Sequence, residues 1–207
     1  MNAPARIWCL RHAESQNVTA GVSGAVPAAS LTDRGHAQAE AMAGTLAAEP
    51  IVAICTSTAL RTRQTAGPLA AARGLPIQAL PDLAEVGIGS SEGSADPAIG
   101  RRTADVLRAW IVDGELSQQV SDGETGHQVL ARMTTAFCRI AAVHPGESIA
   151  VIGHVASLTL ALDRLCALDG LTWGTPLPHA EPFLIEHDRH RWRCLAWPGR
   201  EPMIYRT

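Results

Sequence analysis

Residues 6–12 of the chain read RIWCLRH, and this stretch decides how the fold is interpreted. Its first five residues, Arg6 to Leu10, form a short, mainly apolar run of the kind that a buried β-strand shows. Two similar runs occupy residues 51–57 and 148–153. All three runs are therefore predicted to be strands.

Longer segments with helical periodicity alternate with these strands. Thr32 can cap a helix that runs to about Ala47. Further helices are expected over residues 58–72 and 127–143 and directly after His154, and a late hairpin over residues 183–187 and 191–197 with its turn at 188–190. This alternation predicts an α/β fold: a three-layer sandwich with a mostly parallel central sheet and helices on both faces.

Residues 87–123 follow this pattern less clearly. They are less periodic than the rest of the chain and rich in Gly, Ser and Asp. We expect them to form an excursion over the edge of the sheet rather than a core element. The expected organisation is one domain over residues 1–207, with an insertion or cap at about 87–123.

The composition excludes several classes of chemistry. All 17 basic residues are Arg, because the sequence contains no Lys. A phosphate-binding loop with Lys, a Schiff-base Lys and a Ser–Lys dyad are therefore excluded. What remains is a side chain suited to bidentate recognition of phosphate or carboxylate. The formal net charge of −3 argues against nucleic-acid binding through a broad basic face.

Cysteine usage and hydropathy bear on where the protein works. The five cysteines are dispersed and form no C-x-x-C pair, which is typical of reduced thiols in a cytoplasm. The apolar run before Arg11 is too short for a signal peptide, so a cytoplasmic location is expected. No apolar stretch reaches the roughly 18 residues of a membrane span, so no membrane association is expected.

Four basic side chains follow directly on the predicted strands. Arg11 and His12 follow the first strand, Arg61 follows the second, and His154 follows the third. Ligands of open α/β sheets bind beyond the carboxyl ends of the strands. Arg61 falls in the first turn of its helix, where N–H groups are unpaired and the dipole is positive. Two Arg, two His and a helix N-terminus suit a dianion, and phosphate is the obvious candidate.

Five motifs in order along the chain carry a more specific pattern. They are LRHAESQN at residues 10–17, LTDRGHAQA at 31–39, TSTALRTRQTA at 56–66, LAEVGIGSSEG at 83–93, and GET at 123–125 with VIGH at 151–154. In this order they resemble the motifs of the histidine phosphatase superfamily, in its phosphoglycerate-mutase-like branch (branch 1). The resemblance spans nearly the whole chain.

The resemblance implies roles for the matching residues. His12 is the expected nucleophile and becomes a phosphohistidine, so it must be neutral, with its second ring nitrogen donating to a fixed acceptor. Glu85 is expected to protonate the leaving oxygen and then to activate water. That double role calls for a raised pKa, which a phosphate dianion beside the carboxyl group favours.

The other matching residues are expected to hold the phosphoryl group. Arg11, Arg61 and His154 would clamp its oxygens and offset charge in the transition state. Asn17, Ser23 and the main-chain N–H of Val155 would complete the phosphate cradle. No metal ion and no cofactor are expected, because the two Arg supply the positive charge. The expected partner is a small phosphorylated substrate, and a homodimer is common for such folds.

The chain departs from the family pattern at four positions. Ala13 replaces the usual Gly, which is tolerated unless the position needs a positive φ. Val155 replaces a common Gly and narrows the pocket. Ser91 stands at the usual Trp, and Ala84 where Arg or Asn is frequent. These positions border the substrate, so the sequence does not name the substrate.

Three other functions remain open. A phosphoglycerate-mutase-type phosphoryl transfer would need the intermediate to be kept dry, and a catalytically reduced binding or regulatory protein could retain the same scaffold. Residues 89–93 also match G-x-S-x-G, which would make Ser91 the nucleophile of a serine hydrolase. The segment lacks the preceding apolar strand and the following helix that this motif needs. His187 and His190 have H-x-x-H spacing, but no third ligand is evident and no metal site is assigned.

Overall fold

The computed structural model describes residues 3–188 and 191–200. Within them, six strands form one sheet in the order β3-β2-β4-β1-β5-β6. The strands are β1 (Ala5–Arg11), β2 (Ile51–Thr56), β3 (Ile77–Ala79), β4 (Ser148–Gly153), β5 (Phe183–Asp188) and β6 (Arg191–Cys194). Strands β1 to β4 run parallel, whereas β5 pairs antiparallel with both β1 and β6.

The three predicted central strands and the late hairpin are confirmed. The second hairpin strand ends at Cys194 rather than Trp197, and residues 189–190 of the expected turn lie outside the described residues. The sequence did not predict β3, a three-residue edge strand whose side chains are partly or fully exposed. Such an element is too short and too exposed to produce an apolar pattern.

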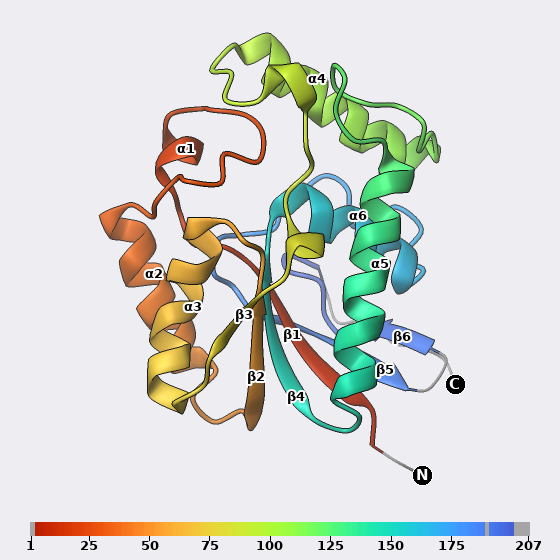
Figure 1. Cartoon of the computed structure of the whole chain (residues 1–207). Helices are drawn as coiled ribbons and strands as arrows, with labels where there is room; N and C mark the ends of the chain where they lie inside the picture. Colours follow the sequence, from red (N-terminus) through yellow and green to blue (C-terminus); the bar gives the residue numbers. More distant parts are fainter. Residues whose placement is uncertain (1–2, 189–190, 201–207) are drawn as a thin grey trace.

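Helices cover both faces of the sheet, so the predicted three-layer fold is confirmed. The helices are α1 (Gln16–Thr19), α2 (Asp33–Thr45), α3 (Leu60–Arg73), α4 (Pro97–Arg108), α5 (Gly126–Val143) and α6 (Val155–Leu165). Figure 1 shows α2 and α3 on one side of the sheet and α5 and α6 on the other. Thr32 caps α2 as expected, with its side chain accepting from the Gly35 N–H at 3.0 Å. None of the described helices is both long and apolar enough to cross a bilayer.

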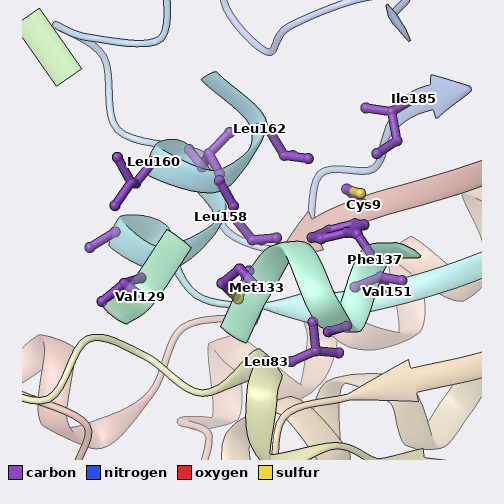
Figure 2. Packing of buried hydrophobic residues seen from close by; sticks show 14 of the residues in the cluster. Cys9, Leu83, Val129, Met133, Phe137, Val151, Leu158, Leu160, Leu162 and Ile185 are labelled. Carbon is purple, nitrogen blue, oxygen red and sulfur yellow. The ribbon is translucent and has the colours of Figure 1, made fainter. Parts of the chain in front are cut away.

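Alternate side chains of the strands supply the two halves of the core. Ile7 and Cys9 of β1 point into the cluster that α5 and α6 complete. Figure 2 shows Phe137 of α5 next to Cys9, and Leu158 of α6 close by. Leu10 belongs instead to the cluster under α2 and α3. All residues of β4 are buried, and those of β1 are buried except Arg6, Trp8 and Arg11, as expected for central strands covered on both faces.

Residues 87–123 are more ordered than their composition predicts. They contain α4, whose N-terminus is capped by Asp96 accepting from the Ala98 N–H at 2.8 Å. The segment also supplies five buried members of the main core cluster: Ile88, Val106, Trp110, Ile111 and Val120. The expectation that it forms no core element is therefore wrong. The glycine, serine and proline residues around α4 made the helical spacing of its apolar residues hard to recognise in the sequence. Figure 1 places α4 across the top of the sheet.

Candidate active site

The first residues after β1 and β4 lie together because these strands are parallel neighbours. Arg11 is in register with Gly153, and the His12 N–H donates to the Gly153 carbonyl at 3.0 Å. The rings of His12 and His154 consequently approach edge to face, with centroids 5.2 Å apart. Both side chains are buried. Two residues that are more than a hundred positions apart in the sequence thus form one centre.

Arg61 connects the two histidine rings. It lies in the first turn of α3, as predicted, and is only 1% exposed. Its Nε–H donates to Nε2 of His12 at 3.1 Å, and Nη2 donates to Nδ1 of His154 at 3.1 Å. Nη1 and Nη2 also donate to the carbonyls of Val26 and Ala25, each at 2.8 Å. Four hydrogen bonds therefore hold the guanidinium between both rings and the loop after α1.

His12 is held in one neutral form. Its Nδ1–H donates to the Ala13 carbonyl at 2.7 Å, which leaves Nε2 as the unprotonated nitrogen. Burial, and then the Arg61 guanidinium, lower the pKa of His12 well below its usual range. The fixed acceptor that a nucleophilic His12 requires is thus present. Ala13 is not among the described residues with positive φ, so its replacement of Gly causes no backbone strain.

His154 has the opposite tautomer. Since Nδ1 accepts from Arg61, the ring proton lies on Nε2, which donates to Oγ of Ser57 at 2.7 Å. Ser57 in turn pairs with the hydroxyl of Thr62 at 2.9 Å. Burial, and then Arg61, lower the pKa of His154 well below its usual range. Sequence reasoning missed Ser57, although its position at the end of β2 was a usable signal.

Glu85 lies at the N-terminus of α6. Its carboxylate accepts from the N–H groups of Ala156 at 3.2 Å and Ser157 at 2.9 Å. It also accepts from the N–H of Val86 at 2.9 Å. A carboxylate at this place is stabilised by unpaired helix N–H groups and by the helix dipole. Because α6 begins directly after His154, the helix brings Glu85 to the histidine centre.

Arg132 of α5 holds the segment that carries Glu85. Its guanidinium donates to the carbonyls of Asp82, Ala84 and Glu85 at 2.9, 2.7 and 3.2 Å. It also forms a salt bridge with Glu124 at 2.8 Å, and Glu124 accepts from the Gly87 N–H. Arg132 was not predicted to belong to the site, because a lone Arg on a helix has no distinguishing sequence pattern.

Two further predicted residues have polar groups left over for a ligand. Nε of Arg11 is buried and has no hydrogen-bond partner, while Nη1 donates to the Leu177 carbonyl at 3.0 Å. Burial lowers the pKa of Arg11, so an anion beside it would be strongly favoured. The side-chain oxygen of Asn17 accepts from the Ser15 hydroxyl at 2.8 Å. The amide nitrogen of Asn17 is thereby oriented as the available donor.

These groups line one cavity of about 540 Å³. Seven of the predicted residues line it: Arg11, His12, Asn17, Ser23, Arg61, Glu85 and Val155. His154 is not in the lining and reaches the centre through its contact with Arg61. The main-chain N–H of Val155 is at the first position of α6, where a helix offers no internal acceptor.

Other parts of the site were not found from the sequence. His179 donates from Nδ1 to the His12 carbonyl at 2.8 Å and supports the backbone at the centre. One face of α4 and the loop at residues 172–176 also line the cavity. These segments carry no chemical motif, so only their position reveals them.

Among the described residues, neither a serine-hydrolase site nor a metal centre is assembled. Ser91 lies in a short 3-10 turn, far from the preceding β3, and its hydroxyl pairs with that of Ser121 at 2.6 Å. The strand–serine–helix arrangement of a nucleophile elbow is therefore not formed. Across residues 3–188 and 191–200, no group of three or more His, Cys, Asp or Glu is placed to hold a metal ion. His190 lies outside these ranges.

Comparison with known sequences gives one family. The model of the histidine phosphatase superfamily (branch 1) matches residues 7–198. An uncharacterized protein of Mycobacterium tuberculosis is 32% identical over 155 residues, which cover 72% of each chain. The adenosylcobalamin/alpha-ribazole phosphatase of Salmonella typhimurium is 27% identical over 164 residues, 79% of this chain and 80% of that protein.

Solved structures share the fold over almost the full length. The mycobacterial glucosyl-3-phosphoglycerate phosphatase has a TM-score of 0.80 and 21% identity, covering 93% of this chain and 98% of its own. Phosphoglycerate mutase from Bacillus anthracis has a TM-score of 0.81 and 13% identity, covering 93% and 92%. Since both a phosphatase and a mutase have this fold, the fold alone does not separate the two reactions.

Proposed function

The chain belongs to the histidine phosphatase superfamily (branch 1), and from this premise we propose that it hydrolyses a small phosphomonoester through a phosphohistidine on His12. One observation carries the proposal: Arg61 bridges the unprotonated nitrogens of His12 and His154 beside a cavity lined by Arg11, whose buried Nε has no hydrogen-bond partner. A neutral nucleophile beside two fixed cations is the arrangement that phosphoryl transfer to histidine needs.

In the first step, Nε2 of His12 attacks phosphorus. The N–P bond forms, the bond from phosphorus to the ester oxygen breaks, and a proton from the Glu85 carboxyl group passes to the leaving oxygen. The Nδ1–H bond to the Ala13 carbonyl stabilises the positive charge that the ring acquires. The alcohol then leaves the cavity.

In the second step, water attacks the phosphohistidine. Glu85 takes a proton from this water, the new O–P bond forms, and the N–P bond breaks. His12 returns to its neutral form and inorganic phosphate is released. The short path from Glu85 to the histidine centre, across the first turn of α6, lets one carboxyl group serve both steps.

The phosphoryl oxygens would be held by residues that already line the cavity. Arg11 supplies its free Nε–H, and Arg61 turns the Nε–H that it now donates to His12 toward the incoming oxygen. Asn17, Ser23 and the Val155 N–H supply neutral donors. His154 acts by orienting Arg61. These donors favour the charge of the transition state without a metal ion.

Hydrolysis is favoured over mutase-type transfer. The relative that is 27% identical over 79% of this chain is named as an adenosylcobalamin/alpha-ribazole phosphatase. The solved phosphatase and mutase structures, at 21% and 13% identity, support only the shared fold. We therefore assign transfer of the phosphoryl group to water as the reaction.

The experiment is a phosphate-release assay. We expect the wild-type protein to hydrolyse p-nitrophenyl phosphate and members of a metabolite panel in the presence of EDTA, and His12→Ala to abolish this activity. His36→Ala is the matched control, because His36 is an exposed residue of α2 away from the cavity. No phosphate release by the wild type from any ester, or full activity of His12→Ala, would overturn the proposal.

A further inference from the structure

Much of the cavity is built from side chains that the proposed chemistry does not use. α1 and the residues just after it, Ile88, α4 and the loop at residues 172–176 contribute these side chains, and Figure 1 shows α1 and α4 at the top of the sheet. We call them the apolar wall. Its large apolar members are Val18, Val22, Ile88, Leu107, Trp173 and Pro176.

The face of α4 that lines the cavity is apolar or small. Gly100, Thr103, Ala104 and Leu107 follow the i, i+3, i+4, i+7 spacing of one helix face. The charged residues of α4 are exposed and do not line the cavity. Among them, Arg102 donates to the Gln118 side chain and Arg108 pairs with Asp113. The helix thus directs its charges away from the cavity.

The charged groups that do line the cavity all belong to the histidine centre. Among the described lining residues they are Arg11, Arg61 and Glu85, besides His12 itself. The proposed chemistry assigns all of them to the phosphoryl group or to proton transfer. No cation is left among these residues to pair with a second anionic group of a substrate.

Hydroxyl groups in the walls are also largely committed. Thr103 donates to the Ile99 carbonyl, Thr159 to the Val155 carbonyl, and Thr172 to the carboxylate of Asp163. Asp163 is buried and also accepts from the Gly170 N–H, so it fixes the start of the loop that carries Trp173. A substrate rich in hydroxyl groups would find few free donors here.

From these four observations we infer that the group esterified to the phosphate is uncharged and mainly apolar, such as an alkyl or aryl alcohol. This inference rests on the proposed phosphatase function and names its substrate class. A cavity of about 540 Å³ is in the range that holds a phosphate and a mid-sized organic group. A carboxylate or second phosphate in the same place would lose water without gaining a partner.

Binding of phosphonates, which the enzyme cannot hydrolyse, tests the inference separately from catalysis. Calorimetry on the full chain would compare methyl-, butyl-, hexyl- and octylphosphonate with 5-phosphonopentanoate, which ends in a carboxylate. Each added pair of buried methylenes is expected to strengthen binding by about tenfold. 5-Phosphonopentanoate is expected to bind at least about tenfold more weakly than hexylphosphonate. Affinity that does not rise with chain length, or equal binding of the carboxylate, would overturn the inference.

Two substitutions of the same kind locate the effect. Leu107→Asn places an amide in the apolar wall. It should weaken the binding of hexylphosphonate about tenfold and leave the binding of methylphosphonate unchanged. Val112→Asn is the matched control, because Val112 is exposed just after α4 and does not line the cavity. Equal losses for both phosphonates in Leu107→Asn, or none, would contradict the assignment.

Turnover separates the two proposals. Hexyl phosphate, glycerol 3-phosphate and 3-phosphoglycerate are all esters of primary alcohols, so differences in kcat/KM report the contacts of the alcohol rather than its leaving ability. We expect kcat/KM for hexyl phosphate to be at least about tenfold higher than for the other two esters. If p-nitrophenyl phosphate is hydrolysed but hexyl phosphate has no advantage, the apolar-substrate inference fails and the phosphatase stands. If no ester is hydrolysed but phosphonate affinity still rises with chain length, the phosphatase proposal fails and the preference of the cavity for an apolar group stands.

Discussion

Nε of Arg61 lies 3.1 Å from Nε2 of His12 and donates its hydrogen to the lone pair that would attack phosphorus. The proposed nucleophile is therefore kept unprotonated by a cation that must release it when a phosphoryl group enters. The same guanidinium orients His154, so one side chain couples both rings. The first prediction tests this coupling.

Arg61→Lys should lower kcat on the order of a hundredfold or more, because an ammonium group cannot bridge two rings and a phosphoryl oxygen at fixed angles. The measurement is steady-state hydrolysis of p-nitrophenyl phosphate. Arg63→Lys is the matched control, since Arg63 is exposed on the same helix and does not line the cavity. Comparable rates for the two variants would show that the bridge is not needed.

Glu85→Gln separates the two chemical steps. The amide cannot donate a carboxyl proton, so hydrolysis of an alkyl phosphate should fall by about 10²–10⁴-fold. Nitrophenolate leaves without a proton, so p-nitrophenyl phosphate should still phosphorylate His12 while water attack is slowed. We expect a burst of nitrophenolate, measured by stopped-flow absorbance, followed by slow turnover. Equal losses on both esters, with no burst, would remove Glu85 from these roles.

Arg132 is a positioning residue whose substitution should act through Glu85. Arg132→Gln removes the clamp on the carbonyls of Asp82, Ala84 and Glu85. We expect kcat to fall by about tenfold to a hundredfold with little change in KM. Arg132→Lys should retain part of the kcat that Arg132→Gln loses. Arg139→Gln, on the exposed side of α5, should leave kcat unchanged. A change in thermal stability with unchanged kcat would assign Arg132 a purely structural role.

The stability of the ligand-free protein should decrease as pH falls below about 6.5. Burial, and then Arg61, hold the pKa of both His12 and His154 well below their values in the unfolded chain. Between the folded and unfolded pKa values the unfolded state binds more protons, so the free energy of unfolding rises with pH. Each such histidine contributes a slope of up to about 1.4 kcal/mol per pH unit.

Urea unfolding at pH 7.5 and 5.5 measures this dependence. His12→Ala should make the difference between the two pH values smaller, because one buried titrating group is removed. His36→Ala should leave the difference unchanged, since His36 is exposed on α2. An identical pH dependence in the wild type and His12→Ala would contradict the low pKa assigned to His12.

The sequence by itself determined the three central strands, the late hairpin, most of the long helices and the basic residues at the strand ends. Apolar runs and helical periods are local signals, and parallel neighbouring strands necessarily bring Arg11, His12 and His154 to one edge. The place of Arg61 after the second strand, in the first turn of its helix, pointed to the same edge, and the motif order added Glu85. This part of the site was predictable because the neighbouring positions in the sequence form a recognisable pattern around each residue.

Only the tertiary structure decided which segments surround that centre. Arg132 clamps the Glu85 segment from 47 residues away, and His179 reaches the His12 carbonyl from 167 residues away. Residues 87–123 were expected to form an excursion over the sheet edge, yet α4 within them contributes a cavity wall and, through Val106, a core side chain. Such contacts depend on how distant segments pack and on loop paths, which no local pattern of charge or hydropathy specifies.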